Sequence, residues 1–183
     1  MSQRTEIRVS GFGGQGVILC AHIIGKAVSI YQGAHATMTQ AFGPEARGSA
    51  CSAQVVLSDE TVLYPYITRP SILIAMSQDA CDKFAPQMAP GGLLLVESDL
   101  VHPGSLPKGV RVLGIPATRL AEELGKKMVL NIVMFGFFAA TSGVLTPEAA
   151  REAVKSSVPA GTEELNLKAY EKGFEHGRAA LRS

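Results

Sequence analysis

The first residues whose types and spacing could support chemistry are Gly11 to Gly16, Gly-Phe-Gly-Gly-Gln-Gly, which fit the pattern G-x-G-x-x-G. They follow a short apolar stretch, Ile7–Val9, and precede a helical pattern from about Val17 to Tyr31. Glycines permit a tight turn, and bare backbone N–H groups at the start of a helix attract phosphate or carboxylate. The pattern predicts a loop for an anion or cofactor, formed by Gly11, Gly13, Gly14, Gln15 and Gly16.

Three interpretations of this glycine loop stay open. It could bind a dinucleotide, it could bind another anion or cofactor, or it could be a structural turn that allows close packing. A dinucleotide site also expects an acidic residue about 20 positions later, to bind the ribose hydroxyls. No Asp or Glu occurs between Ile7 and Pro44, which argues against NAD.

A second motif runs from Thr39 to Gly48, Thr-Gln-Ala-Phe-Gly-Pro-Glu-Ala-Arg-Gly. It contains a Gly-Pro turn signal and two opposite charges, Glu45 and Arg47. One interpretation is an ordered loop that presents Gln40, Glu45 and Arg47 to a ligand or a partner chain. The other is a solvated surface loop, and the residues alone favour it.

The remaining reactive side chains are dispersed. The cysteines Cys20, Cys51 and Cys81 lie about 30 residues apart, and the four histidines show no ligand spacing. Zinc and iron–sulfur sites usually need closely paired cysteines or histidines. We therefore expect this chain to hold no metal. Dispersed cysteines and a start without an apolar signal core predict a cytoplasmic protein.

Composition limits the function classes. The chain has 183 residues and a mass of 19.3 kDa, which predicts a single domain over residues 1–183. Hydrophobic residues make up 46%, and the mean hydropathy is +0.19, which excludes intrinsic disorder. A net charge of +1 gives no support for nucleic-acid binding. Charged residues make up only 18%, so we expect some uncharged surface to meet another protein.

Strand and helix patterns alternate along the chain. Strands are expected at Ile7–Val9, Ala34–Thr39, Ser49–Leu57, Ser71–Met76, Leu93–Val96 and Val110–Ile115. Helices are expected at Val17–Tyr31, Asp79–Met88 and Ala117–Lys127, and after Thr146 and Thr162. This order predicts an α/β fold, a three-layer α/β/α sandwich with a mostly parallel, Rossmann-like sheet. Because no helix precedes Ser49–Leu57, that strand is expected to be antiparallel, which makes the sheet mixed.

The segment from Met128 to Pro147 carries no charged residue. Its length is near the 20 or so residues of a membrane span. Polar residues and glycines interrupt it, so we expect a helix that is buried or forms an interface, and no membrane span. Gly173 and Gly177 lie four apart on the expected last helix, which indicates close packing against a neighbour.

The two motifs together resemble the gamma subunit of 2-oxoacid:ferredoxin (or acceptor) oxidoreductases. The resemblance covers about Ile7 to Arg178. It continues through Pro70–Met76, Lys83-Phe84 and Pro90-Gly91-Gly92. It also includes Asn131–Gly136, which looks like the apolar interface helix of the family and implies interface roles for Asn131, Phe135 and Gly136.

The resemblance implies a complex that decarboxylates a 2-oxoacid oxidatively, with coenzyme A as co-substrate and ferredoxin as electron acceptor. Thiamine diphosphate, Mg²⁺ and iron–sulfur clusters would lie on partners: alpha and beta subunits and a ferredoxin-like subunit. This chain would hold no cofactor firmly and would have no turnover alone. Gln40 and Glu45 would face partner subunits, and Arg47 would pair with a coenzyme A phosphate or a partner acid. For the isolated chain, a homodimer is one possibility.

The wording of the second motif bears on the substrate. Pyruvate-type gamma subunits usually look more like G-V-E-R-R-G, whereas Gly43–Gly48 is closer to 2-oxoglutarate and branched-chain types, and we favour 2-oxoglutarate. The family often has a second glycine where this chain has Ser49. Two other functions remain as alternatives: a stand-alone NAD(P)-dependent oxidoreductase that uses the glycine loop, and a purely structural assembly subunit.

Overall fold

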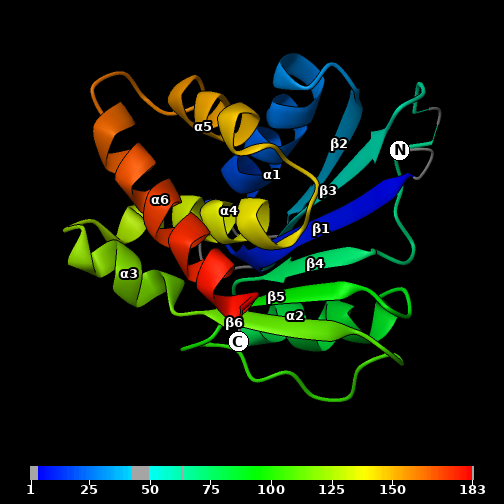
Figure 1. The fold of residues 1–183 in the computed structure, drawn as a ribbon. Coiled ribbons are helices and arrows are strands. Elements are labelled where there is room, and N and C mark those ends of the chain that lie inside the picture. Colours follow the sequence, from blue (N-terminus) through cyan, green and yellow to red (C-terminus); the bar gives the residue numbers. More distant parts are fainter. Residues whose placement is uncertain (1–3, 43–49, 63, 183) are drawn as a thin grey trace.

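A six-stranded sheet forms the centre of the protein, for which a computed structural model describes residues 4–42, 50–62 and 64–182 (Figure 1). The strand order is β2-β3-β1-β4-β5-β6. The strands are β1 (Thr5–Phe12), β2 (His35–Phe42), β3 (Ala50–Ser58), β4 (Ile72–Ala75), β5 (Leu93–Glu97) and β6 (Arg111–Ile115). Each expected strand is present, within a few residues of its predicted bounds.

The sheet is mixed in the way the sequence predicts. β1, β4, β5 and β6 run parallel, and β3 lies antiparallel to both β1 and β2. β2 therefore runs in the same direction as β1. As a result, the carboxyl ends of five strands lie at one edge of the sheet, and only β3 begins there.

Helices cover both faces and complete a three-layer α/β/α sandwich, as predicted (Figure 1). One face carries α2 (Gln78–Phe84), which continues into the 3-10 turn η2 (Ala85–Gln87). The other face carries α1 (Val17–Lys26), α3 (Ala117–Glu123), α4 (Leu130–Thr141), α5 (Pro147–Lys155) and α6 (Glu163–Ala180). The π-helical turn η1 (Ala27–Tyr31) extends α1. The 3-10 turn η3 (Lys127–Val129) precedes α4.

Local chemistry explains where several helices begin and end. The Thr146 hydroxyl accepts a hydrogen bond from the Ala149 N–H at 3.2 Å, so Thr146 caps α5 as expected. The prediction of a helix to Lys127 was too long, because α3 ends at Glu123. The chain then turns through Gly125, whose φ of 84° favours glycine.

The uncharged segment forms α4, which is buried within this chain. Gly136 lies so close to α6 that a Cβ there would collide with the Tyr170 carbonyl oxygen, and one at Gly173 would collide with that of Val133. The predicted close packing of the glycines of α6 is confirmed. None of the helices in the described ranges is both long and apolar enough to cross a membrane.

This packing corrects the interface roles assigned to α4. Asn131 is 3% exposed, Phe135 is fully buried, and Gly136 faces α6. Because α6 and the sheet already cover these residues, they present no surface to another subunit. The apolar composition of the helix reflects its position in the core of its own domain.

Candidate functional site

The carboxyl edge of the sheet gathers the segments that the sequence singles out. The glycine loop follows β1, and residues 40–42 end β2. Through β3 they are neighbours, because Cys51 pairs with Gly11 on one side and with Phe42 on the other. In open α/β sheets, ligands and partners usually meet this edge. We therefore regard it as the candidate functional site.

The glycine loop is shaped by close packing. Gly11 belongs to β1 and not to the turn, and a Cβ there would lie 3.0 Å from the Cβ of Met76. Gly14 and Gly16 have φ angles of 99° and 73°, which other residues rarely adopt. Gly13 is half-buried between them and the end of β1. Gly11, Gly14 and Gly16 therefore lie where the packing or the backbone angle favours glycine.

Gln15 closes the loop from inside. Its Oε1 accepts a hydrogen bond from the Phe12 N–H at 2.7 Å, and its Nε2 donates to the Met76 carbonyl oxygen at 2.8 Å. The side chain thereby joins the ends of β1 and β4. It also gives the Phe12 N–H an oxygen partner, as a bound phosphate or carboxylate would. A ligand at this N–H would have to displace Gln15, so the closed loop offers no support for the dinucleotide alternative.

Asn131 completes the closure from α4. Its Nδ2 donates to the Gly16 carbonyl oxygen at 3.3 Å, and a Cβ on Gly16 would lie 2.8 Å from the Asn131 Cβ. The glycine at position 16 is thus required both by its backbone angle and by Asn131. Asn131 was predicted at an interface, but its contacts hold the glycine loop.

Residues 43–48 of the second motif lie outside the described residues, and the two predicted charged contacts, Glu45 and Arg47, are among them. The structure does place Gln40, which is exposed near the end of β2 and pairs with Ala53 of β3. Phe42, at the end of the same strand, is 68% exposed. The start of this motif therefore reaches solvent at the candidate edge, in contrast to the closed glycine loop.

Glu97, at the end of β5, is a buried carboxylate at the same edge. It is fully buried, and its oxygens accept hydrogen bonds from the Asp99 N–H and the Thr118 hydroxyl, each at 3.3 Å. Burial is the main cause that raises the pKa of Glu97, and the hydrogen bonds oppose this effect. The side chain fastens β5 to the start of α3, a role that suits structure more than substrate binding.

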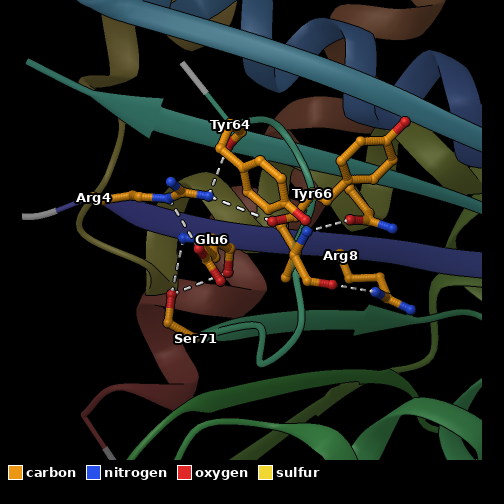
Figure 2. A network of polar contacts seen from close by, with 8 residues as sticks. Arg4, Glu6, Arg8, Tyr64, Tyr66 and Ser71 are labelled. Atoms are coloured by element: carbon orange, nitrogen blue, oxygen red, sulfur yellow. Dashed lines mark hydrogen bonds and ion pairs between the residues drawn. The ribbon is translucent and has the colours of Figure 1, made fainter. Parts of the chain in front are cut away.

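A polar network that the sequence does not reveal holds the segment between β3 and β4 (Figure 2). Nη2 of Arg4 donates to the Tyr64 carbonyl oxygen at 2.9 Å, and Nη2 of Arg8 donates to that of Ile67 at 3.1 Å. The Ile67 N–H in turn donates to Oε1 of Gln54 at 2.7 Å. These bonds fix an irregular segment beside β1 and leave Tyr66 59% exposed.

Arg8 is buried on the central strand, where arginine is unusual. It is 7% exposed, and its guanidinium lies 4.3 Å from the centre of the Phe84 ring. Burial lowers the pKa of this guanidinium. The ring face of Phe84 and the carbonyl of Ile67 partly compensate the charge. The alternation of β1 could have placed Arg8 opposite the apolar face, but no signal in the sequence gives its contacts.

The described residues contain no group of three or more His, Cys, Asp or Glu side chains that could hold a metal ion. The three thiols are free and buried, on α1, β3 and α2. Burial raises the pKa of the Cys20 thiol to about 12, which suits a core residue and not a nucleophile.

Comparison with known proteins identifies the family. The model of the family described as pyruvate ferredoxin/flavodoxin oxidoreductase matches residues 6–176. This chain belongs to that family. It is 44% identical to the 2-oxoglutarate synthase subunit KorC of Methanocaldococcus jannaschii, over 96% of this chain and 95% of the relative.

Two further members place the chain within the family. The gamma subunit of a keto/oxoacid ferredoxin oxidoreductase from Geobacter sulfurreducens PCA has a solved structure with a TM-score of 0.84 and 42% identity. That match covers 96% of this chain and 99% of the other. The pyruvate synthase subunit PorC of Methanothermobacter thermautotrophicus is 29% identical, over 93% of this chain and 94% of the relative. The resemblance to gamma subunits is confirmed.

Proposed function

We propose that this chain is the gamma subunit of a 2-oxoglutarate:ferredoxin oxidoreductase, which converts 2-oxoglutarate and coenzyme A into an acyl-CoA, CO₂ and reduced ferredoxin. The observation that carries the proposal is the difference in identity between two nearly full-length relatives. The chain is 44% identical to a 2-oxoglutarate synthase subunit and 29% identical to a pyruvate synthase subunit. The second motif, Gly43–Gly48, favours the same substrate.

The redox chemistry of this complex belongs to its partners in our proposal. Thiamine diphosphate, Mg²⁺ and the iron–sulfur clusters would be held by alpha, beta and ferredoxin-like subunits. The donor set of this chain does not fit a cluster, because its three cysteines are buried on separate elements. The chain would contribute surface to a cytoplasmic assembly and would show no turnover alone.

The carboxyl edge of the sheet is the surface that we assign to this contact. Gln40 is exposed there, and the chain continues from it into Glu45 and Arg47. The guanidinium of Arg47 would bind a coenzyme A phosphate or a carboxylate of a partner. The glycine loop, closed by Gln15, would support this edge as a rigid contact surface.

Purification from cells under anaerobic conditions tests the proposal. A tag on this chain should co-purify thiamine diphosphate-dependent and ferredoxin-like subunits. The eluate should reduce an acceptor with 2-oxoglutarate and coenzyme A faster than with pyruvate. A complex that prefers pyruvate would contradict the substrate, and a chain that elutes alone and binds NAD(P) would contradict the proposal as a whole.

The role of Arg47 can be separated from assembly. In the purified complex, Arg47→Ala should raise the KM for coenzyme A by roughly tenfold, because one charge-assisted hydrogen bond contributes about 1.5–3 kcal/mol. Arg69→Ala is the matched control, since Arg69 is exposed just before β4, at the opposite edge of the sheet. An unchanged KM in an intact complex would exclude this role.

A further inference from the structure

β2 is the outermost strand on one side of the sheet, and its residues lack the features that usually protect such a strand from pairing with other strands. Its eight residues, His35–Phe42, contain no Lys, Arg, Asp, Glu or Pro. All eight are exposed or half-buried. Natural sheets usually protect an edge with charges, proline or a short strand, because unpaired N–H and C=O groups bind other strands. At the opposite edge, β6 has five residues and begins with Arg111.

A groove accompanies this edge on the face that α1 covers. It has a volume of about 470 Å³ and lies between α1 and β2. Its lining combines small and apolar residues with polar ones: Ala21, Gly25, Ile30, Ala36 and Met38, and His22, Lys26, Ser29 and Thr37. Ile30 is 67% exposed. A strand added beside β2 would direct alternate side chains into this groove, because successive side chains point to opposite faces.

We propose that two copies of this chain pair through β2, antiparallel and around a two-fold axis at Thr39. In such a pair, directly opposed residues must lie on the same face of the sheet, so the axis passes through one residue that pairs with itself. With Thr39 on the axis, Phe42 of the second copy lies opposite Ala36.

Phe42 and the groove are on the same face. Phe42 pairs with Cys51 and Ala36 pairs with Leu57, and both β3 residues belong to the core under α1. Phe42 of each copy would therefore enter the groove of the other, which buries two exposed aromatic rings and the two Ile30 side chains. The surface is self-complementary, and the uncharged strands do not repel each other.

This inference goes beyond the proposed function and does not depend on it. It concerns the full chain purified without partner subunits, so it can fail while the proposed complex stands. A strand from a different protein would fit the same edge less specifically, since Phe42 and the groove occur together in every copy of this chain.

Disulfide cross-linking of the full chain tests the register. Two Thr39→Cys residues would face each other across the axis, within the 4.4–6.8 Å between Cα atoms that a disulfide needs. Thr37→Cys is the matched control, because Thr37 is also half-buried and on the same face. Two Thr37 positions would lie about 14 Å apart, four residues along the strands.

Under mild oxidation, Thr39→Cys should give at least about fivefold more covalent dimer than Thr37→Cys. The native cysteines are buried and should not contribute. Equal cross-linking of the two variants, or none by Thr39→Cys, would overturn the proposed pairing.

A second measurement does not require a covalent bond. Sedimentation of the unmodified chain should show a mass that rises with concentration from 19.3 kDa toward twice that value. Phe42→Ser should weaken the dimer by roughly tenfold, since it removes a buried aromatic ring from each groove. A chain that stays monomeric, or a Phe42→Ser variant that dimerises as strongly as the original, would overturn the proposal.

Discussion

The contact between α4 and α6 and the edge formed by β2 and α1 use their residues in opposite ways. α4 is apolar on all sides and contains Gly136 against α6, features that resemble a surface for another subunit. Within this chain they are fully covered. β2 alternates small, polar and apolar residues and has no obvious interface pattern, yet it remains open to solvent.

The difference shows that an apolar segment needs to be buried, but that its composition does not tell whether the same chain or another chain buries it. α4 contains Phe135, Phe137 and Phe138, and all three side chains are buried. Helix α6 of the same chain packs against α4 and helps to bury this apolar surface. A strand needs only a partner backbone. In this chain, the unpaired backbone lies at β2, whereas the most apolar helix is already covered.

The largest effect on stability is expected from a substitution that disrupts the contact between α4 and α6. Gly136→Ala should lower the free energy of unfolding by about 3 kcal/mol, because the new Cβ collides with backbone and not with a movable side chain. Calorimetry should show a melting temperature about 6–12 °C lower. Gly104→Ala is the control, since Gly104 lies in an exposed loop with open space around it. A Gly136→Ala variant as stable as the original would mean that α4 and α6 can separate cheaply.

A smaller loss is expected where the glycine loop is closed. Gln15→Ala removes the hydrogen bonds to the Phe12 N–H and the Met76 carbonyl oxygen, and should cost about 2 kcal/mol in chemical denaturation. Gln32→Ala is a matched control, because Gln32 also bridges two backbone groups, those of Val144 and Thr146, but is exposed. Equal losses for the two variants would show that burial adds nothing to the closure by Gln15.

Because the carboxyl group of Glu97 is buried, we expect the free energy of unfolding to depend on pH. Its pKa is raised in the folded state, so the folded protein retains a proton that the unfolded chain releases above about pH 4.5. Stability from this group is therefore lost as pH rises from that value through the folded pKa. Relative to the original, the stability of Glu97→Gln should rise between pH 4 and pH 7, because glutamine has no proton to lose.

Urea unfolding at several pH values measures this difference. Glu175→Gln, at an exposed position of α6, removes the same charge without affecting a buried group and serves as control. A stability difference between Glu97→Gln and the original that stays constant with pH would contradict the assignment.

The sequence predicts those features of the fold and the site that depend on neighbouring residues, and misses those that depend on residues far apart in the chain. Strands and most helices were predicted because their patterns are local, and the antiparallel β3 followed from the missing helix before Ser49. The glycine loop was located, but its closure depends on Asn131, which is 115 residues away from Gly16. Periodicity cannot reveal such a contact. For the same reason α4 was assigned to another subunit, since nothing local identifies α6 as its cover.

The smallest effect on stability is expected at the open edge. Thr39→Lys changes a half-buried position on a strand with one free side, so the free energy of unfolding should change by no more than about 0.5 kcal/mol. The same change would place two lysines opposite each other across the proposed axis, where like charges destabilise a strand pair. The variant should therefore sediment as a folded monomer at concentrations where the original dimerises.

Gly136→Ala should show the reverse, with reduced stability and, while folded, unchanged association. If Thr39→Lys lowered stability as much as Gly136→Ala, β2 would be part of the core, and the contrast between the two regions would be lost.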